Sequence, residues 1–235
     1  REVVTGVMFE TDRPRYHFLD ERRASIQRFV DERLPDHFNM IVSHAKDESA
    51  YVVHSGSDRF LGTYYLLRVE PMELTKIFDL SPWLDENEMA ELRSISYRSR
   101  DGLTIPGYLT LPPGEEPRNL PMVVHPHGGP WARDSWGFIP DVQFLANRGY
   151  AVLQMNFRGS VGFGREFMEA SFGQWGLTMQ DDITDAVGWA VEQGFADPNR
   201  IAIYGGSYGG YATLSGITKT PELFACAISY VGVSN

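Results

Sequence analysis

The sequence predicts an α/β protein in which a parallel sheet with helices on both faces follows a region of short antiparallel strands. Two observations lead to this prediction. From residue 121 onward, short apolar runs alternate with stretches of helical spacing, which is typical of β-α-β units. Residues 1–80 instead hold short strand-like runs separated by turn residues. A boundary is expected between the regions, where residues 80–91 are rich in Ser, Pro, Asp and Glu.

The N-terminal region contains four short runs that are rich in Val, Ile, Tyr and Phe and are predicted to be strands: Val3–Phe9, Asn39–Ser43, Ala50–His54 and Tyr64–Val69. Between them, Ser25–Leu34 has apolar residues at helical spacing and is predicted to be a helix that Pro35 ends. Strands at this spacing suit an antiparallel sheet, a sandwich or a propeller blade. No repeat within the region identifies a propeller from these residues alone.

The predicted domains are residues 1–93 and 94–235. The second begins with a hairpin, in which Ile95–Arg98 and Ile105–Leu111 flank a turn at Asp101-Gly102. Pro121–His125 is then almost continuously apolar, as expected for a strand buried on both faces of a sheet.

The remaining elements are predicted to alternate between helix and strand. They are a helix at Phe138–Ala146, a strand at Tyr150–Met155, a loop at Phe157–Trp175, a helix from Thr178 to Gly194, a strand at Arg200–Tyr204, a helix at Ser207–Ile217 and a strand at Phe224–Tyr230. Thr178 and Asp181 resemble a capping box, with Asp in place of the usual Glu.

A glycine-flanked serine, Ser207, lies in Gly205-Gly206-Ser207-Tyr208-Gly209-Gly210, between a predicted strand and a predicted helix. This is the context in which G-x-S-x-G forms a nucleophile elbow. The turn is so sharp that the serine backbone is strained, and the glycines at 205, 206, 209 and 210 are expected to prevent collisions. We therefore predict that Ser207 is a nucleophile that forms an acyl-enzyme. The alternative is a serine in an ordinary helix-capping turn.

A second glycine motif, His127-Gly128-Gly129-Pro130, directly follows the buried strand Pro121–His125. Glycines there allow backbone N–H groups to point into a pocket, as in the H-G-G oxyanion loop after the third strand of α/β-hydrolases. The predicted oxyanion donors are the backbone N–H groups of Tyr208 and Gly129. Loss of one such donor typically lowers kcat by about 10²–10³-fold.

The composition excludes several functions. The formal net charge of −10 argues against a nucleic-acid or anionic-membrane partner. No run approaches the ~18 apolar residues of a membrane span. Cys226 is the only cysteine, so no internal disulfide is expected, and its apolar neighbours predict a buried thiol. The histidines of the N-terminal region lack metal-ligand spacing, and the serine motif lacks the G-K-[ST] ending of a phosphate loop, so no metal or cofactor is predicted.

The motifs HGGP (127–130), NFRGSVGFG (156–164) and YGGSYGGY (204–211) resemble the prolyl oligopeptidase family of serine peptidases (S9). They most resemble its acylaminoacyl-peptidase and dipeptidyl-peptidase-like branch. The likeness covers about residues 94–235, and residues 1–93 resemble more loosely the last blades of the family's β-propeller. The resemblance implies the C-terminal part of a propeller followed by the N-terminal part of an α/β-hydrolase catalytic domain, incomplete at the C-terminus, that acts on short peptides.

The resemblance also implies roles for residues around the serine. Tyr208 and Val233 match positions that wall the S1 pocket, and a plain core role for Val233 stays open. Arg158 and Asp182 match recurring family positions. For these two, an ion pair that holds the 157–176 loop is favoured, and direct contact with substrate is the alternative. Gly128, Gly205 and Gly209 are expected to support the site structurally.

The general base is missing from the sequence. No histidine follows His127, and Glu222 is the only acidic residue after Ser207, so the triad Asp and His are absent. His127 itself is rejected as the base, because α/β-hydrolases place the acid and then the histidine after the serine. We expect it to orient its own loop, and His125 to be structural too.

Several expectations concern the whole protein. The chain begins without Met and resembles an excised piece, so we expect residues 1–235 to be inactive alone and the full-length protein to be active. The alternatives are a carboxylesterase or lipase-like hydrolase and, from another class, a non-catalytic interaction protein that keeps the hydrolase fold. A peptide substrate is the expected partner, and a homo-oligomer of the full-length protein is left open. A cytoplasmic location is favoured over a periplasmic or secreted one, without excluding either.

Overall fold

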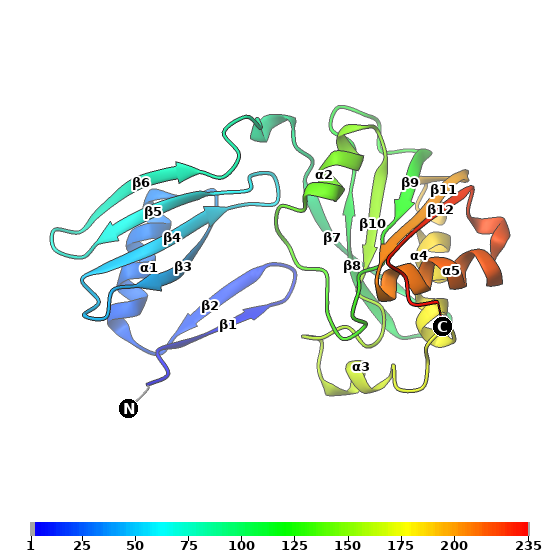
Figure 1. The fold of residues 1–235 in the computed structure, drawn as a ribbon, viewed down its shortest axis with the longest axis horizontal. Coiled ribbons are helices and arrows are strands. Elements are labelled where there is room, and N and C mark those ends of the chain that lie inside the picture. The colour runs from blue at the N-terminus through cyan, green and yellow to red at the C-terminus, as the bar shows by residue number, and fades with distance from the viewer. Residues whose placement is uncertain (1–2, 235) are drawn as a thin grey trace. The chain divides into compact units, whose positions relative to one another are not determined.

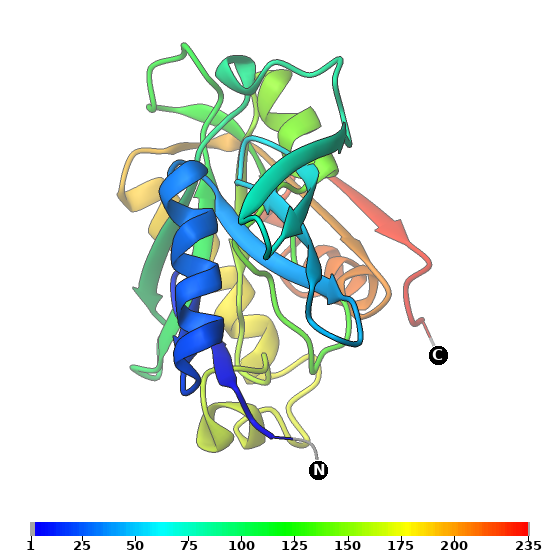
Figure 2. The same ribbon diagram turned by 90° about the vertical axis from the view of Figure 1, so that its left-hand side faces the viewer.

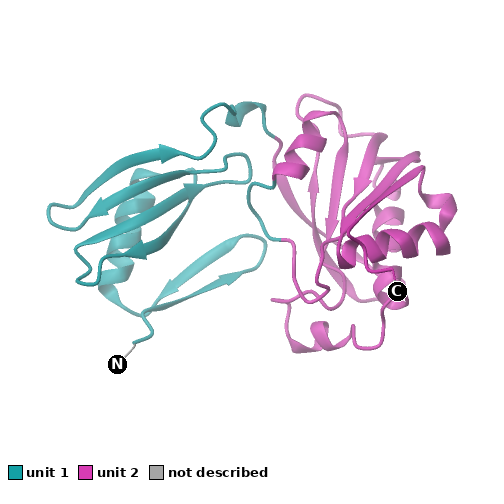
Figure 3. Ribbon diagram, in the orientation of Figure 1, with its two compact units in different colours: residues 1–89, 135–139 teal, residues 90–134, 140–235 magenta. Residues whose placement is uncertain are grey.

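The structure, a computed structural model, describes residues 3–234, and the chain folds into two compact units. The first unit comprises residues 1–89 and 135–139, and the second comprises residues 90–134 and 140–235 (Figure 3). The predicted boundary after residue 93 falls inside strand β7 (Leu92–Arg98), slightly beyond the observed division. The chain therefore leaves the second unit after Asp134 and returns to it at Pro140.

The first unit contains two antiparallel sheets (Figure 1). Their strands are β1 (Gly6–Glu10) and β2 (Pro14–Phe18) in one sheet, and β3 (Phe38–His44), β4 (Ala50–Gly56), β5 (Thr63–Arg68) and β6 (Glu73–Asp79) in the other. Four antiparallel strands in chain order form the sheet of a propeller blade. The four predicted strands correspond to β1, β3, β4 and β5, whereas β2 and β6 were not predicted.

The predicted helix of this unit is α1 (Glu21–Arg33), which begins four residues earlier than its apolar spacing indicated. Asp20 caps it, because its side chain accepts a hydrogen bond from the backbone N–H of Arg23 at 2.8 Å. The helix buries Ile26 and Val30 in one apolar cluster with side chains of the four-stranded sheet. Figure 2 shows the helix lengthwise beside that sheet.

The second unit is built on a six-stranded sheet with the order β12-β11-β9-β10-β8-β7. Its other strands are β8 (Thr104–Thr110), β9 (Leu120–Val124), β10 (Ala151–Met155), β11 (Ala196–Gly206) and β12 (Cys226–Tyr230). Strands β9 to β12 are parallel, and β7 and β8 form an antiparallel hairpin at one edge. The parallel sheet predicted from residue 121 onward is confirmed.

The helices of this unit are α2 (Pro140–Asn147), α3 (Arg165–Glu169), α4 (Thr178–Glu192) and α5 (Tyr208–Lys219), and η1 (Glu86–Glu88) and η2 (Pro221–Leu223) are short 3₁₀ turns of the chain. From β9 to β10 the chain steps one way along the sheet, and from β10 to β11 it steps back. Since such crossovers are right-handed, α2 covers one face while α4 and α5 cover the other. No helix of residues 3–234 has the length and apolar character needed to cross a bilayer.

Three local predictions were wrong. The predicted loop at 157–175 contains the short helix α3. Thr178 does not cap α4, because its hydroxyl donates to the side chain of Gln174 at 3.1 Å while Leu177 occupies the N-cap position. Cys226 is exposed and not buried, because β12 is an edge strand of the sheet within the described chain.

Candidate active site

Ser207 lies at the turn between β11 and α5, at the carboxyl end of the parallel strands. Its backbone has φ 56° and ψ −118°, a conformation that residues other than glycine rarely adopt. Its N–H donates to the carbonyl of Tyr230 at 3.0 Å, and its carbonyl accepts from the N–H of Tyr211 at 3.0 Å. The side chain is exposed at the tip of this turn. The geometry is that of the predicted nucleophile elbow.

The glycines around Ser207 are crowded, with one exception. A Cβ at Gly205 would overlap the backbone of Gly209, and a Cβ at Gly209 would overlap the carbonyl oxygen of Pro126. A Cβ at Gly210 would lie 2.6 Å from Cα of Gly232. At Gly206 the nearest atom would be 3.6 Å away, in the ring of Tyr230, so no collision requires a glycine there. The prediction that all four glycines prevent collisions is wrong for Gly206.

The second glycine motif lies directly beside the serine. A Cβ at Gly128 would be 3.4 Å from Cβ of Ser207 and 4.0 Å from its Oγ. Gly129 has φ +122°, and a Cβ there would be 2.8 Å from the backbone N of Trp131. Both its backbone angle and its surroundings therefore require glycine. Tyr208 is the first residue of α5, where the backbone N–H has no partner within the helix. The two predicted oxyanion donors thus lie on the two segments that adjoin Ser207.

His127 is buried, and both of its ring nitrogens have partners. Nδ1 contacts the carbonyl oxygen of Gly128 at 2.7 Å and therefore donates, and Nε2 contacts Oγ of Ser160 at 2.8 Å. The ring stacks on Phe157 at 4.3 Å. Burial lowers the pKa of His127 to about 4, although the hydrogen bond to Gly128 opposes the shift. These contacts join the ring to its own loop and to residue 160.

His125 directly follows strand β9 and contacts the backbone of β11 at Tyr204, three residues before Ser207. Its Nδ1 lies 2.7 Å from the carbonyl oxygen of Tyr204, and its ring stacks on the Tyr204 ring at 4.9 Å.

The two residues predicted to wall an S1 pocket differ in exposure. The Tyr208 side chain is 1% exposed, with its ring packed against Phe157, Trp175 and Tyr211. Burial raises the pKa of its hydroxyl. Val233 is 44% exposed. In this structure Val233 presents surface to solvent and the Tyr208 ring does not, so the S1 roles stay predictions.

Arg158 and Asp182 form a buried, two-point ion pair. The guanidinium donates to both carboxylate oxygens, at 2.8 Å from Nε and 2.7 Å from Nη2, and the backbone N–H of Arg158 donates to the same carboxylate at 2.9 Å. The third guanidinium nitrogen, Nη1, donates to Asp101 at 2.7 Å and holds the pKa of that carboxyl below its usual value. The Asp182 side chain is fully buried. The pair joins the segment after β10 to α4 and to the β7–β8 turn, which favours the structural role over contact with substrate.

Three polar residues near the site were missed as individual positions, although they lie in or next to the NFRGSVGFG motif. Ser160 contacts His127, while Asn156 and Gln154 hydrogen-bond to Asp134. The sequence feature that could have identified these residues is the group of polar side chains at the end of the apolar strand β10. Residues 3–234 contain no group of three or more His, Cys, Asp or Glu side chains arranged to hold a metal ion.

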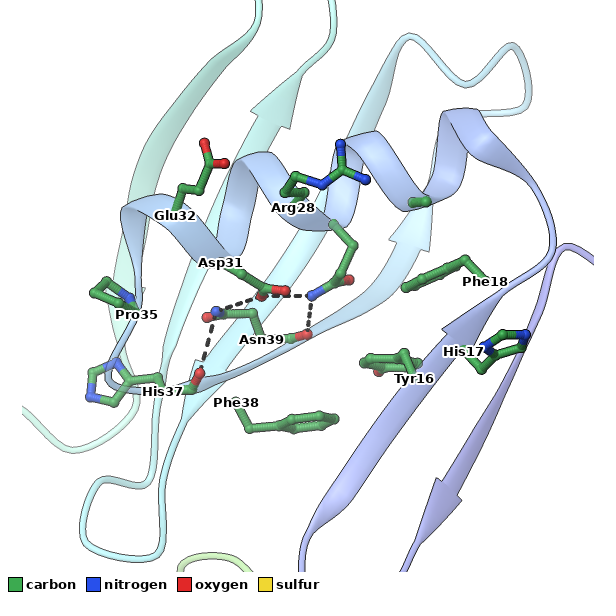
Figure 4. Close-up of a pocket in the computed structure, with 12 residues that line it drawn as sticks. Tyr16, His17, Phe18, Arg28, Asp31, Glu32, Pro35, His37, Phe38 and Asn39 are labelled. Carbon is green, nitrogen blue, oxygen red and sulfur yellow. Dashed lines mark hydrogen bonds between the residues drawn. The ribbon is translucent and has the colours of Figure 1, made fainter.

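A separate cavity of about 720 Å³ lies in the first unit, beside α1, β2 and β3 (Figure 4). Its polar wall is a network in which Oδ1 of Asp31 accepts from Gln27 at 2.9 Å and from Asn39 at 3.0 Å. The residues that line this cavity include none of the predicted site residues.

The chain is similar to known proteins of one peptidase family. The family model described as prolyl oligopeptidase family matches residues 136–235. Dipeptidyl aminopeptidase BIII of Pseudoxanthomonas mexicana is 45% identical over 213 residues, which cover 88% of this chain and 29% of that protein. Dipeptidyl peptidase family member 6 of Caenorhabditis elegans is 41% identical over 216 residues, covering 83% of this chain and 29% of that protein.

Among solved structures, a puromycin-hydrolyzing peptidase of Mycobacterium tuberculosis has a similar fold, with a TM-score of 0.70 and 30% sequence identity. The similarity covers 79% of this chain and 29% of that one. The chain thus spans about 29% of the length of each of these three relatives.

Proposed function

Because the chain belongs to the prolyl oligopeptidase family of serine peptidases, in its acylaminoacyl-peptidase and dipeptidyl-peptidase-like branch, we propose that the protein hydrolyses short peptides through an acyl-enzyme on Ser207. The observation that supports this most directly is the position of Gly128 against Ser207, which brings the H-G-G loop to the nucleophile elbow. The similarity to proteins named as peptidases supports a peptide as the substrate class.

In the proposed reaction, Oγ of Ser207 adds to the carbonyl carbon of the scissile bond. The N–H groups of Tyr208 and Gly129 donate hydrogen bonds to the oxygen that becomes negative. The C–N bond then breaks, the amine leaves with a proton, and water hydrolyses the resulting ester to restore the serine hydroxyl. The sharp turn between β11 and α5 places Oγ of Ser207 at its tip, where a substrate can reach it, and the surrounding structure imposes the strained backbone that this requires.

The test uses the protein with its natural termini and a fluorophosphonate probe, which labels an activated serine. We expect labelling of the wild type, loss of labelling in Ser207→Ala, and unchanged labelling in Ser215→Ala, a control serine within helix α5, which follows Ser207. Labelling that persists in Ser207→Ala would assign the nucleophile elsewhere.

Turnover separates peptidase from esterase activity. We expect hydrolysis of a peptide nitroanilide by the wild type, with kcat/KM compared against the matched peptide ester. An enzyme that cleaves the ester but leaves the amide intact would contradict the peptidase proposal.

A further inference from the structure

The H-G-G loop is attached along its length to a second segment of the same unit. We call residues 127–134 the oxyanion loop and residues 154–171 the support segment. Nε2 of His127 contacts Ser160 at 2.8 Å, and the carbonyl of Ala132 accepts from the N–H of Val161 at 2.9 Å. The indole N–H of Trp131 donates to Ser171 at 3.2 Å. The H-G-G motif and the NFRGSVGFG motif, which are separate in the sequence, are thus held together by hydrogen bonds.

The attachment is closest at the end of the loop, where one side chain binds both backbone groups of Asp134. Oδ1 of Asn156 accepts from the Asp134 N–H at 2.7 Å, and Nδ2 of Asn156 donates to the Asp134 carbonyl at 3.1 Å. The amide of Asn156 therefore supplies the two hydrogen bonds that a neighbouring strand would supply. Gln154 adds a third, because its Nε2 donates to Oδ1 of Asp134 at 2.9 Å.

These side chains extend from a rigid part of the molecule. Gln154 lies on β10, and Asn156 follows it by two residues, at the period that places strand side chains on one face. Strand β10 is buried throughout and lies between β9 and β8. Asn156 and Gln154 are each 1% exposed, so a substrate cannot touch them. Their effect on chemistry has to pass through Asp134.

A glycine-rich loop needs such an external support. Gly128 and Gly129 have no side chains to restrict their backbone angles, and Gly129 lies in the left-handed region at φ +122°. An oxyanion donor acts only when it lies about 2.7–3.1 Å from the developing charge. A displacement of roughly 1 Å can reduce the rate by about 10²-fold.

We propose that Asn156 is a positioning residue for the oxyanion hole: by binding both backbone groups of Asp134, it fixes the loop that presents the Gly129 N–H beside Ser207. This inference rests on the proposed function, because an oxyanion forms only if the protein performs acyl transfer. Asn156 is not a catalytic residue, since it lies beneath the loop and is out of reach of the substrate.

The molecule provides a matched control for a two-point amide contact. Gln143, on α2, accepts from the N–H of Ala90 at 2.9 Å and donates to the carbonyl of Ala90 at 2.8 Å. It is 5% exposed, and Ala90 lies at the start of the second unit, outside the oxyanion loop. Gln143→Ala therefore removes the same kind of contact without removing support from Gly129.

The kinetic experiment compares Asn156→Ala with Gln143→Ala in the protein with its natural termini. For a peptide nitroanilide, we expect Asn156→Ala to lower kcat by about 10–100-fold and to change KM by less than about two-fold, because the lost interaction acts in the transition state. Affinity for a peptide aldehyde, whose adduct with Ser207 places an oxygen in the oxyanion hole, should fall by a similar factor. Gln143→Ala should change neither.

A second measurement does not depend on activity. Backbone amide hydrogen exchange in residues 128–134 should be faster in Asn156→Ala than in the wild type, and unchanged in Gln143→Ala. If Asn156→Ala fails to fold, Asn156→Asp takes its place, since its carboxylate still accepts from the Asp134 N–H but replaces the donor with an oxygen that repels the Asp134 carbonyl.

The outcomes separate the two proposals. A wild type that hydrolyses no peptide contradicts the proposed function, while the exchange result still decides whether Asn156 fixes the loop. Unchanged exchange overturns the inference. So does an equal fall in kcat for the two variants, or a lowered Tm in Asn156→Ala with unchanged kcat and aldehyde affinity.

Discussion

The backbone at Ser207 is strained, because φ 56° with ψ −118° suits glycine and not serine. Strain of this kind costs roughly 1–3 kcal/mol. Glycine would relieve it and would lose about 0.4–1 kcal/mol through the greater freedom of the unfolded chain.

We therefore expect Ser207→Gly to raise the free energy of unfolding by about 1 kcal/mol, while Ser207→Ala, which keeps a Cβ, gives no gain. Urea unfolding of the three proteins measures the difference. A Ser207→Gly protein no more stable than Ser207→Ala would show that the turn is not strained.

His127 makes the stability of the fold depend on pH. Burial lowers its pKa to about 4 in the folded protein, whereas in the unfolded chain the ring titrates near its ordinary 6.5. Between these two values the unfolded state binds a proton that the folded state does not, so lowering the pH through this window destabilises the fold. The stabilisation is complete above pH 6.5 and is lost as the pH falls towards 4.

In His127→Asn this contribution disappears. We expect the free energy of unfolding of the wild type to fall by a few kcal/mol more than that of His127→Asn when the pH is lowered from 6.5 to 4. Urea titrations at several pH values give this difference directly, and parallel curves for the two proteins would contradict it.

At the level of single residues, the sequence predicted where a residue lies along the fold better than it predicted which side chains contact that residue. The position of Ser207 at a strand–helix turn and of Gly128 in a loop followed from local patterns, because glycines report backbone geometry. The partners of His127 did not follow, since Ser160 is 33 residues away and is brought to it only by the fold. The buried ring of Tyr208 depends in the same way on distant aromatic residues.

Among elements, the β11–α5 turn gives a comparison of two glycines three residues apart. A Cβ at Gly209 would overlap the carbonyl oxygen of Pro126, but a Cβ at Gly206 would have no neighbour nearer than 3.6 Å. We expect Gly209→Ala to destabilise the protein by about 2 kcal/mol or more, as overpacking against backbone does. Gly206→Ala should stay within about 0.5 kcal/mol of the wild type. Thermal unfolding tests the pair, and equal Tm changes would refute the crowding at Gly209.

The ion pair that joins α4 to the segment after β10 gives another comparison. Asp182 is fully buried against Arg158, whereas its neighbour Asp181 pairs with Arg100 at the surface and is 38% exposed. Removing one partner of a buried pair costs about 3–5 kcal/mol, but an exposed pair contributes about 0–1 kcal/mol. Asp182→Asn should therefore lower the free energy of unfolding far more than Asp181→Asn. If denaturant titrations give the same free energy of unfolding for the two variants, the buried pair of Asp182 and Arg158 does not contribute more than the exposed pair of Asp181 and Arg100.

The two strands that the sequence failed to predict, β2 and β6, share a physical cause. Strand β6 pairs with a single neighbour at the edge of its sheet, and β2 forms only a two-stranded hairpin. Such strands are held by backbone hydrogen bonds and bury few side chains, so their sequences lack the apolar runs of β9 and β10. Cys226 shows the converse, since an apolar sequence was taken for a buried strand that in fact lies at an edge.

For the whole molecule, the predicted fold class is confirmed: antiparallel strands of propeller type precede an α/β-hydrolase sheet. Apolar periodicity predicted the parallel sheet and the short antiparallel strands, because each kind of sheet buries its strands in a characteristic way. The hydrolase and propeller assignments depended on the resemblance of the glycine and serine motifs to the family. The inclusion of residues 135–139 in the first unit was not predicted, because it depends on contacts with residues distant in the sequence: the Ser135 hydroxyl and the Trp136 backbone N–H both donate to the side chain of Glu10.

The distribution of histidines leads to an expectation for the chain as a whole. The six histidines of residues 1–235 all precede Ser207, and the nearest motif histidine, His127, has both ring nitrogens engaged. Without a general base, catalysis is reduced to what binding and the oxyanion hole provide. We expect residues 1–235, prepared alone, to show no measurable turnover of a peptide nitroanilide. Turnover abolished by His127→Asn would instead identify His127 as the base.

The route of the chain between the units has a mechanical consequence. The backbone leaves the second unit directly after Asp134. A force on residues 135–139 therefore acts first on that residue. Asn156 ties Asp134 to the end of a central strand, and a sheet resists such a load better than a glycine loop does. We therefore expect a displacement of residues 135–139 to be resisted by this contact with the end of β10 before it reaches the backbone of Gly129.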